Sequence, residues 1–205
     1  MKKSILAVAG LAAVAGVVGP VAGAFATDTS THTDTITLTI DSACSFTAKK
    51  GTTATTTGSE YTQTVANGET AYFGGTASAV SDDGTNFTIS CNDQNGWVLT
   101  AVGYSGKDGD SKNVMVASAG TNITSDSAND KGSQWQFWVN GTDAVSSYTN
   151  GYTTIPDSAT KIAGTSSSIS GSVIKVAYKV TIGATQESGT YTGKVKYTLS
   201  HPAAK

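Results

Sequence analysis

The chain has 205 residues and a formal net charge of −2, from 13 basic and 15 acidic residues. Every basic residue is a lysine, and the lysines form no clustered stripe, which argues against binding to a nucleic acid backbone and against bidentate recognition of phosphate. The other polar residues are mainly Thr, Ser, Gly, Asn and Asp, a composition typical of strands joined by tight turns.

The N-terminus has the pattern of a secretory signal peptide. Lys2 and Lys3 precede an uncharged stretch from Ile5 to Val18, and Ala24-Phe25-Ala26 fits a cleavage site. The alternative is a retained membrane anchor, although the apolar stretch is only about as long as the ~20 residues that a span needs. We expect residues 1–26 to be removed, which leaves 179 residues, enough for one domain with no membrane span.

In chain order, we expect a flexible lead-in over residues 27–34, followed by a β-domain over residues 35–205. The first strand is predicted where Ile36, Leu38 and Ile40 alternate with threonines. The same even phase brings Cys44 and Phe46 to the apolar face. Residues 49–68 are rich in Thr and Gly, which favours a long loop or a weak edge strand.

Further strands are predicted from alternation in the middle of the chain. Phe87, Ile89 and Cys91 share one face. A turn over residues 92–96 then leads to a strand with Trp97, Leu99 and Ala101 on one face, and a Gly- and Asp-rich loop follows over residues 105–112. Later strands are expected at residues 114–116 and 135–139, the second with Trp135, Phe137 and Val139 on one face and Trp138 on the other.

The C-terminal region has the clearest pattern. Residues 145–170 are rich in turn-forming residues and remain unassigned, whereas residues 173–182 and 191–199 alternate regularly. These last two segments predict either a β-hairpin or two strands of a sandwich. Because no segment has a 3.6-residue period, we predict an all-β fold, a single antiparallel β-sandwich of the Ig-like or Greek-key type.

The two cysteines, Cys44 and Cys91, are predicted to form a disulfide. Their number is even, the chain is expected to be exported, and each cysteine falls on the apolar face of its own strand. The spacing is not that of a Cys-x-x-Cys redox pair, and no further Cys or His lies nearby to complete a metal site. In an exported protein that meets a reducing environment, both thiols would instead stay free.

No pattern in the chain indicates an enzyme, a cofactor or a metal. His32 and His201 fall in the expected lead-in and tail, where we expect both to be solvated, and the common nucleophile, zinc and phosphate-loop motifs are absent. The acidic residues occur in turns, where their side chains close the turns. Calcium binding or glycosidase chemistry by pairs of these acids are the weaker alternatives; the residues are Asp82, Asp83, Asp108, Asp110, Asp126 and Asp130.

Two segments a hundred residues apart carry a resemblance to a known family. The segment Gly96-Trp97-Val98-Leu99-Thr100-Ala101 is similar to the first Trp-x-Leu motif of the WxL family of bacterial cell-surface proteins. The segment from Gly189 to Pro202, which contains Tyr197-Thr198-Leu199, is similar to the family's closing segment, with tyrosine in place of tryptophan. The resemblance implies a secreted protein that attaches non-covalently to peptidoglycan or another wall polymer, together with other surface proteins. It assigns wall binding to Trp97, Leu99, Tyr197 and Leu199.

Two other functions are left open. A pilin-like or spore-coat-like subunit is indicated by the early cysteine pair and the closing Gly189-Thr190-Tyr191 segment. Such a subunit would assemble by β-strand addition, with residues 49–68 or 35–40 as the edge or the added strand. A polysaccharide-binding or polysaccharide-degrading protein would need an outward aromatic side chain, either Trp135 or Trp138. For wall binding, the polar turn over residues 92–95 is the predicted contact region.

Overall fold

The computed structural model describes residues 42–51, 53–55, 60–104 and 113–202. The predicted signal peptide, the lead-in and the strand at residues 36–40 lie outside these ranges, as do the loop over residues 105–112 and the acids Asp108 and Asp110. The described residues belong to one compact unit.

Within this part of the chain the structure is almost entirely β. The strands are β1 (Cys44–Lys50), β2 (Thr53–Thr55), β3 (Thr70–Phe73), β4 (Thr85–Cys91), β5 (Trp97–Tyr104), β6 (Val114–Ala117), β7 (Ile123–Thr124), β8 (Gln134–Asn140), β9 (Thr160–Thr165), β10 (Ile169–Thr181), β11 (Tyr191–Thr192) and β12 (Lys194–Ser200), with one short helix, α1 (Ser146–Thr149). In the described residues no helix is long and apolar enough to cross a membrane.

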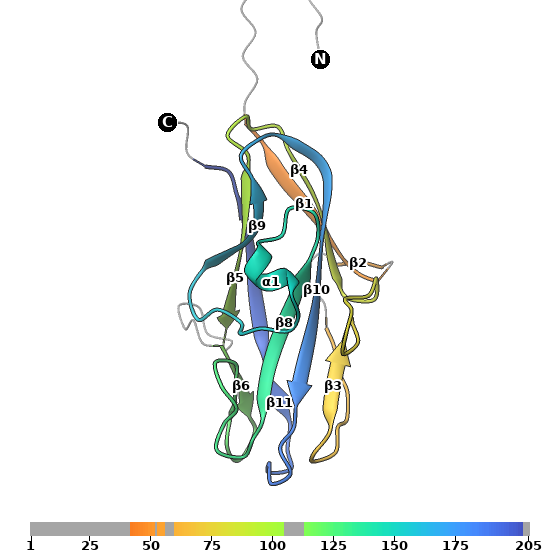
Figure 1. Cartoon of the computed structure of the whole chain (residues 1–205), viewed down its shortest axis with the longest axis vertical. Helices are drawn as coiled ribbons and strands as arrows, with labels where there is room; N and C mark the ends of the chain where they lie inside the picture. Colours follow the sequence, from red (N-terminus) through yellow and green to blue (C-terminus); the bar gives the residue numbers. More distant parts are fainter. Residues whose placement is uncertain (1–41, 52, 56–59, 105–112, 203–205) are drawn as a thin grey trace, which may run out of the picture. The chain divides into compact units, whose positions relative to one another are not determined.

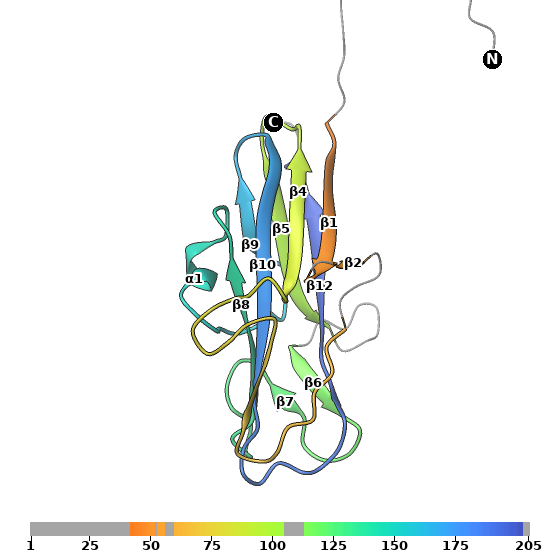
Figure 2. The same ribbon diagram turned by 90° about the vertical axis from the view of Figure 1, so that its right-hand side faces the viewer.

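The strands form two layers of unequal size (Figures 1 and 2). The large sheet has the order β11-β6-β7-β8-β10-β4-β1-β2, with β3 also paired to β10, and the small sheet has the order β12-β5-β9. All pairings are antiparallel except a single parallel contact between β7 and β8. The predicted all-β sandwich is therefore confirmed, with this one parallel pairing added.

The predicted alternation explains how the two layers pack. The inward residues of β4, β5 and β8 are those expected from the sequence, and they are buried. Because the side chains of a strand alternate between its two faces, every second residue faces the other sheet. An apolar residue at these positions is enough to form the core between the two sheets. The core consists mainly of Phe87, Ile89, Cys91, Trp97, Leu99, Ala101, Trp135, Phe137, Val139, Ile162, Ile174 and Val176.

The structure differs from the sequence-based expectation most clearly in residues 145–170. This stretch contains α1, β9 and the first residues of β10. Strand β9 is short, and its Thr160–Thr165 sequence has little apolar alternation, so only its pairing with β5 identifies it as a strand. The last two long strands, β10 and β12, lie in different sheets, and they are therefore two sandwich strands rather than a hairpin.

Candidate functional site

The two tripeptides with an aromatic residue and a leucine lie on neighbouring strands. β12 pairs antiparallel with β5, and Leu199 lies directly opposite Leu99 in this register, while Tyr197 lies opposite Ala101. The two segments are a hundred residues apart in the sequence, yet they lie side by side as the middle strand and an edge strand of the small sheet.

All four residues of the two motifs face the interior of the sandwich. Trp97 and Leu99 have an exposed fraction of 0%, and Tyr197 and Leu199 are half-buried at the edge of the same core. The indole ring of Trp97 is thus not presented at the surface. In this structure the inward side chains hold the strands in place, and the surface that these strands present is formed by the residues between and after them.

Tyr197 makes the one polar contact of the motifs across the core. Its hydroxyl lies 2.7 Å from the hydroxyl of Tyr178 on β10, in the opposite sheet. Burial raises the pKa of both phenols, and for Tyr197 the neighbouring Tyr178 raises it further. By contrast, the indole Nε1 of Trp97 is buried and has no hydrogen-bond partner. The tyrosine in the second motif therefore gains a hydrogen bond between the sheets.

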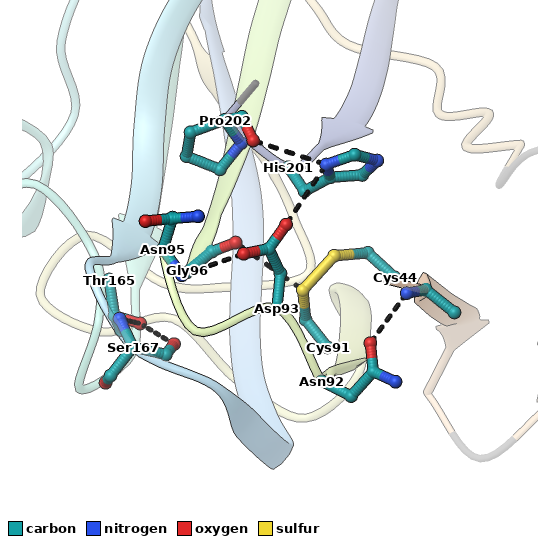
Figure 3. Close-up of a disulfide and its surroundings, with 11 residues drawn as sticks. Cys44, Cys91, Asn92, Asp93, Asn95, Gly96, Thr165, Ser167, His201 and Pro202 are labelled. Carbon is teal, nitrogen blue, oxygen red and sulfur yellow. Dashed lines mark hydrogen bonds and ion pairs between the residues drawn. A yellow bond between two sulfur atoms is a disulfide. The ribbon is translucent and has the colours of Figure 1, made fainter. Parts of the chain in front are cut away.

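The cysteines link two neighbouring strands of the large sheet, β1 and β4, at the end where the chain continues from β4 into β5 (Figure 3). Cys44 and Cys91 lie directly opposite each other on β1 and β4, and their sulfur atoms are 1.97 Å apart. The predicted disulfide is thus present. It closes a loop of 47 residues, for which the chain-entropy model gives a stabilisation of ~4 kcal/mol.

The turn between β4 and β5 is held by Asp93, whose side chain is almost fully buried. Its carboxylate accepts a hydrogen bond of 2.8 Å from the backbone N–H of Asn95. The Nδ1 atom of His201 lies 3.2 Å from the same carboxylate (Figure 3). The backbone hydrogen bond is the main reason why the pKa of Asp93 is lowered, and the contact with His201 lowers it further.

His201 is exposed, as expected from the sequence. It also connects the residue after β12 to the turn that precedes β5 through this contact. The C-terminal strand is therefore attached to the disulfide end of the domain by a side-chain contact as well as by its backbone pairing. His32 lies outside the described residues.

A depression of ≈ 650 Å³ lies at this end of the small sheet, next to the polar turn. Val98, the middle residue of the first motif, lines it, and so does Pro202, three residues after the leucine of the second motif. We call this the motif-end depression; its lining residues are Asn95, Val98, Thr142, Asp143, Ala144, Lys161, Gly164, Thr165, Ser166, Ser167 and Pro202.

Two glycines allow the backbone to approach closely at the motif-end depression. Gly96 has a φ of +86°, and a Cβ atom placed on it would lie 2.0 Å from the carbonyl oxygen of Thr165. A Cβ atom on Gly164 would lie 2.3 Å from the carbonyl oxygen of Trp97. A larger residue at either position would push β5 and β9 apart, and would move Val98 relative to the serine-rich turn.

The motif-end depression offers groups of several kinds to a polar ligand. Lys161 is exposed and presents an ammonium group, and Asn95 contributes an amide. The carboxylate of Asp143 accepts a hydrogen bond from the hydroxyl of Ser172, so this side chain is held in a defined position. Backbone and hydroxyl groups from residues 165–167 complete the lining. The arrangement suits hydrogen bonding to hydroxyl and amide groups, and its lining contains no aromatic ring.

A second depression, of ≈ 540 Å³, lies beside the disulfide. It is lined on the large sheet by residues of β1, β4 and the start of β10, including Cys91 and Asn92. Ser168 lines this second depression, while its neighbour Ser167 lines the first. Three consecutive serines, Ser166-Ser167-Ser168, therefore connect the two depressions at one end of the domain.

The other residues considered in the sequence lie elsewhere. Trp138 is the outward one of the tryptophan pair; it is half-buried, and its indole N–H donates to the carbonyl oxygen of Thr149. Trp135 is buried in the core. The carboxylate of Asp82 contacts Lys175. In the described ranges no group of three or more His, Cys, Asp or Glu side chains is arranged to hold a metal ion.

Sequence reasoning identified the turn over residues 92–95 but missed most of the motif-end depression. Lys161 and the serine-rich turn belong to the region left unassigned, residues 145–170, and Asp143 comes just before it; pairing with β9 brings them next to Asn95. The available signal was the run of serines at residues 166–168 between two strands. No protein-family model, curated protein or solved structure matches the chain.

Proposed function

We propose that this chain is a non-enzymatic, exported cell-surface protein that attaches non-covalently to peptidoglycan or another wall polymer, and that the motif-end depression is its contact surface. The observation that carries the proposal is that the first motif and the end of the second WxL-like segment line this one surface. Val98 comes from within the first motif and Pro202 from just after the second, and both line the same depression. The WxL-like segments thus act together although they are far apart in sequence.

The inward and outward residues of the motifs have separate roles in this proposal. Trp97 and Leu99 anchor β5 in the core, and Leu199 anchors β12 against Leu99. The outward residues and the adjoining turns then bind the polymer. A rigid strand supported by buried aromatic and aliphatic side chains holds its binding groups in place, which lowers the entropy cost of binding.

The chemistry of the depression suits a wall polymer. Peptidoglycan has sugar hydroxyls, amides, carboxylates and amines, and the lining offers an ammonium group, a carboxylate, an amide and several hydroxyls. Because the depression is shallow and polar, each domain is expected to bind weakly. Many equivalent sites on a repeating polymer increase the retention of surface proteins that carry or assemble several such domains.

The test is co-sedimentation of the mature protein with purified cell-wall sacculi. Lys161→Gln removes the ammonium group from the depression, and we expect the dissociation constant to rise at least about tenfold, since a hydrogen bond to a charged group contributes about 1.5 kcal/mol or more. Val98→Glu places a negative charge in the same depression and should abolish sedimentation.

The matched control is Lys49→Gln, on an exposed position of β1 in the other sheet. It has the same change in charge and should sediment as the wild type does. Equal binding by all three variants would exclude this surface, and a wild-type protein that stays in the supernatant would exclude wall binding. Release of reducing sugar ends from the sacculi would indicate an enzyme instead.

A structural subunit that assembles by β-strand addition is the second candidate function. It is favoured by one specific observation, the unpaired outer edge of β12 within the described residues. Residues 53–55, which belong to one of the two segments considered for strand addition, already pair with β1 of their own chain. Residues 35–40 thus remain the candidate for the added strand.

A further inference from the structure

The two sheets of the sandwich end unevenly on one side. In the large sheet β1 lies beyond β4, whereas in the small sheet β12 is the last strand among those described. β1 and β12 run beside each other along this side (Figure 2). The small sheet is therefore short of one strand relative to the large sheet that it covers.

An apolar side chain is left uncovered where this strand is missing. Phe46 is on the inward face of β1 and packs edge-on against Phe87, with ring centroids 5.4 Å apart, yet it is 39% exposed. On β12 the inward residues Val195, Tyr197 and Leu199 are only half-buried, although their counterparts on β5 are fully buried. We call the strip formed by Phe46 and these three residues the open seam.

The outer edge of β12 is able to accept another strand. β12 is seven residues long, and its only pairing among the described strands is with β5. An unpaired strand edge presents N–H and C=O groups to any extended segment of matching length. A strand added there would continue the small sheet at a spacing of about 4.8 Å and would cover the open seam.

We propose that the occupant of this edge is the segment Thr35–Ile40 of a second copy of the chain, added antiparallel to β12. This segment comes just before the first described residue, and its Ile36, Leu38 and Ile40 alternate with threonines. If Ile36 lies opposite Leu199, then Leu38 lies opposite Tyr197 and Ile40 opposite Val195. The three apolar side chains of the segment then cover the three half-buried residues of β12.

The charges agree with the same register. The next residue, Asp41, lies opposite Lys194, and Thr39 lies opposite Lys196. Both lysines are on the exposed face of β12, so the carboxylate and the ammonium group would meet on the outer surface of the extended sheet. A parallel addition would place Asp41 at the far end of β12 from Lys194.

The connection to β1 prevents a chain from filling its own edge in this way. Ala43 and Asn92 form two hydrogen bonds. The backbone N–H of Ala43 donates to the side-chain oxygen of Asn92, and the backbone N–H of Asn92 donates to the carbonyl oxygen of Ala43. Asn92 is next to Asp93, which contacts His201, so Ala43 lies at the level of the end of β12. From there to Val195 is about six residues of strand, or about 20 Å, whereas the three residues from Ile40 to Ala43 span at most about 11 Å.

The contact is heterologous, because the N-terminal segment of one copy meets the β12 edge of the next. Unless the copies close into a ring, such a contact produces an open chain of subunits. In the mature chain this segment would begin eight residues after the predicted cleavage site. Removal of the signal peptide would then release the segment for assembly. This inference does not depend on the proposed wall binding.

Cysteine cross-linking between two tagged proteins tests the proposed register. Thr37→Cys in one copy and Thr198→Cys in another are directly opposite each other in the proposed pairing. Mild oxidation of the mixture should give a covalent dimer that carries both tags. The matched control is Thr100→Cys on β5, which pairs with Thr198 but lies on a strand whose two edges are both occupied; it should give at least tenfold less dimer with Thr37→Cys.

Assembly of the unmodified mature protein gives an independent readout. Light scattering should detect species larger than a monomer, and Leu38→Lys should return the protein to a monomer that still unfolds in one cooperative transition. Equal cross-linking at residues 100 and 198 would overturn the proposal, and so would a protein that is monomeric with residues 27–41 intact. A single chain with both Thr37→Cys and Thr198→Cys that cross-links only within itself would show that the segment fills its own edge.

Discussion

The strands β5 and β12 carry similar tripeptides, but they hold different places in the small sheet. β5 is central, with β12 on one side and β9 on the other, while β12 is an edge. As a result the inward residues of β5 are fully buried and those of β12 are half-buried. The same pattern of an aromatic residue, a β-branched residue and a leucine thus gives a core strand in one place and an accessible edge in the other.

The clearest way to measure this difference is to make the same substitution in both strands. Leu99 and Leu199 lie directly opposite each other, but only Leu99 is completely buried. We expect Leu99→Ala to lower the free energy of unfolding by about 3–4 kcal/mol, and Leu199→Ala by roughly half as much, because the cost follows the buried volume that is lost. Urea denaturation of the mature protein measures both, and equal losses would contradict the assignment of β12 as an edge.

A smaller effect is expected from the hydroxyl that distinguishes Tyr197 from Trp97. Tyr197→Phe removes the hydrogen bond to Tyr178 and should cost about 1 kcal/mol at neutral pH. The pKa of Tyr197 is raised by burial, so the folded state favours the neutral phenol. Its contribution to stability is complete below the ordinary tyrosine pKa of about 10 and is lost as the pH rises above it.

The substitution is therefore expected to reduce the loss of stability in alkali. Unfolding midpoints at pH 7 and pH 11 should differ less for Tyr197→Phe than for the wild type. Thr198→Ala, an outward substitution on the same strand that leaves every phenol in place, serves as the control and should leave the alkaline loss unchanged. A wild-type protein with the same midpoint at both pH values would show that the phenol of Tyr197 is not protected from ionisation by the fold.

The smallest expected effect concerns the contact that ties the end of β12 to the start of β5. The pKa of Asp93 is lowered, chiefly by the N–H of Asn95, so its carboxylate stabilises the fold above its ordinary pKa of about 3.9, and this contribution is lost as the pH falls below that value. Asp93→Asn should thus be less stable than the wild type at pH 6, and the difference should shrink at pH 3. Asp157→Asn, in an exposed loop, is the control; a difference that grows in acid would contradict the prediction.

The depression and the seam show where sequence reasoning stops. The burial of Trp97 and Leu99 follows from alternation alone, and so does the face shared by Cys44 and Cys91. Lys161 and Asp143, however, stand in stretches with little periodicity. Lys161 reaches the site because β9 pairs with β5, and Asp143 because its carbonyl accepts a hydrogen bond from Gly164 of β9. Pairing between strands far apart in the chain is set by the packing of both sheets, which no local pattern records.

The sequence by itself determined the fold class, the inward face of each strongly alternating strand and the pairing of the two cysteines, because each of these depends on the two-residue period of a strand. Only the tertiary structure decided that the two motif strands are neighbours, that one is central and the other an edge, and that Val98 of β5 and Pro202, just after β12, line one depression. These features depend on strand order, and strand order is chosen by how the two sheets together bury the most apolar surface.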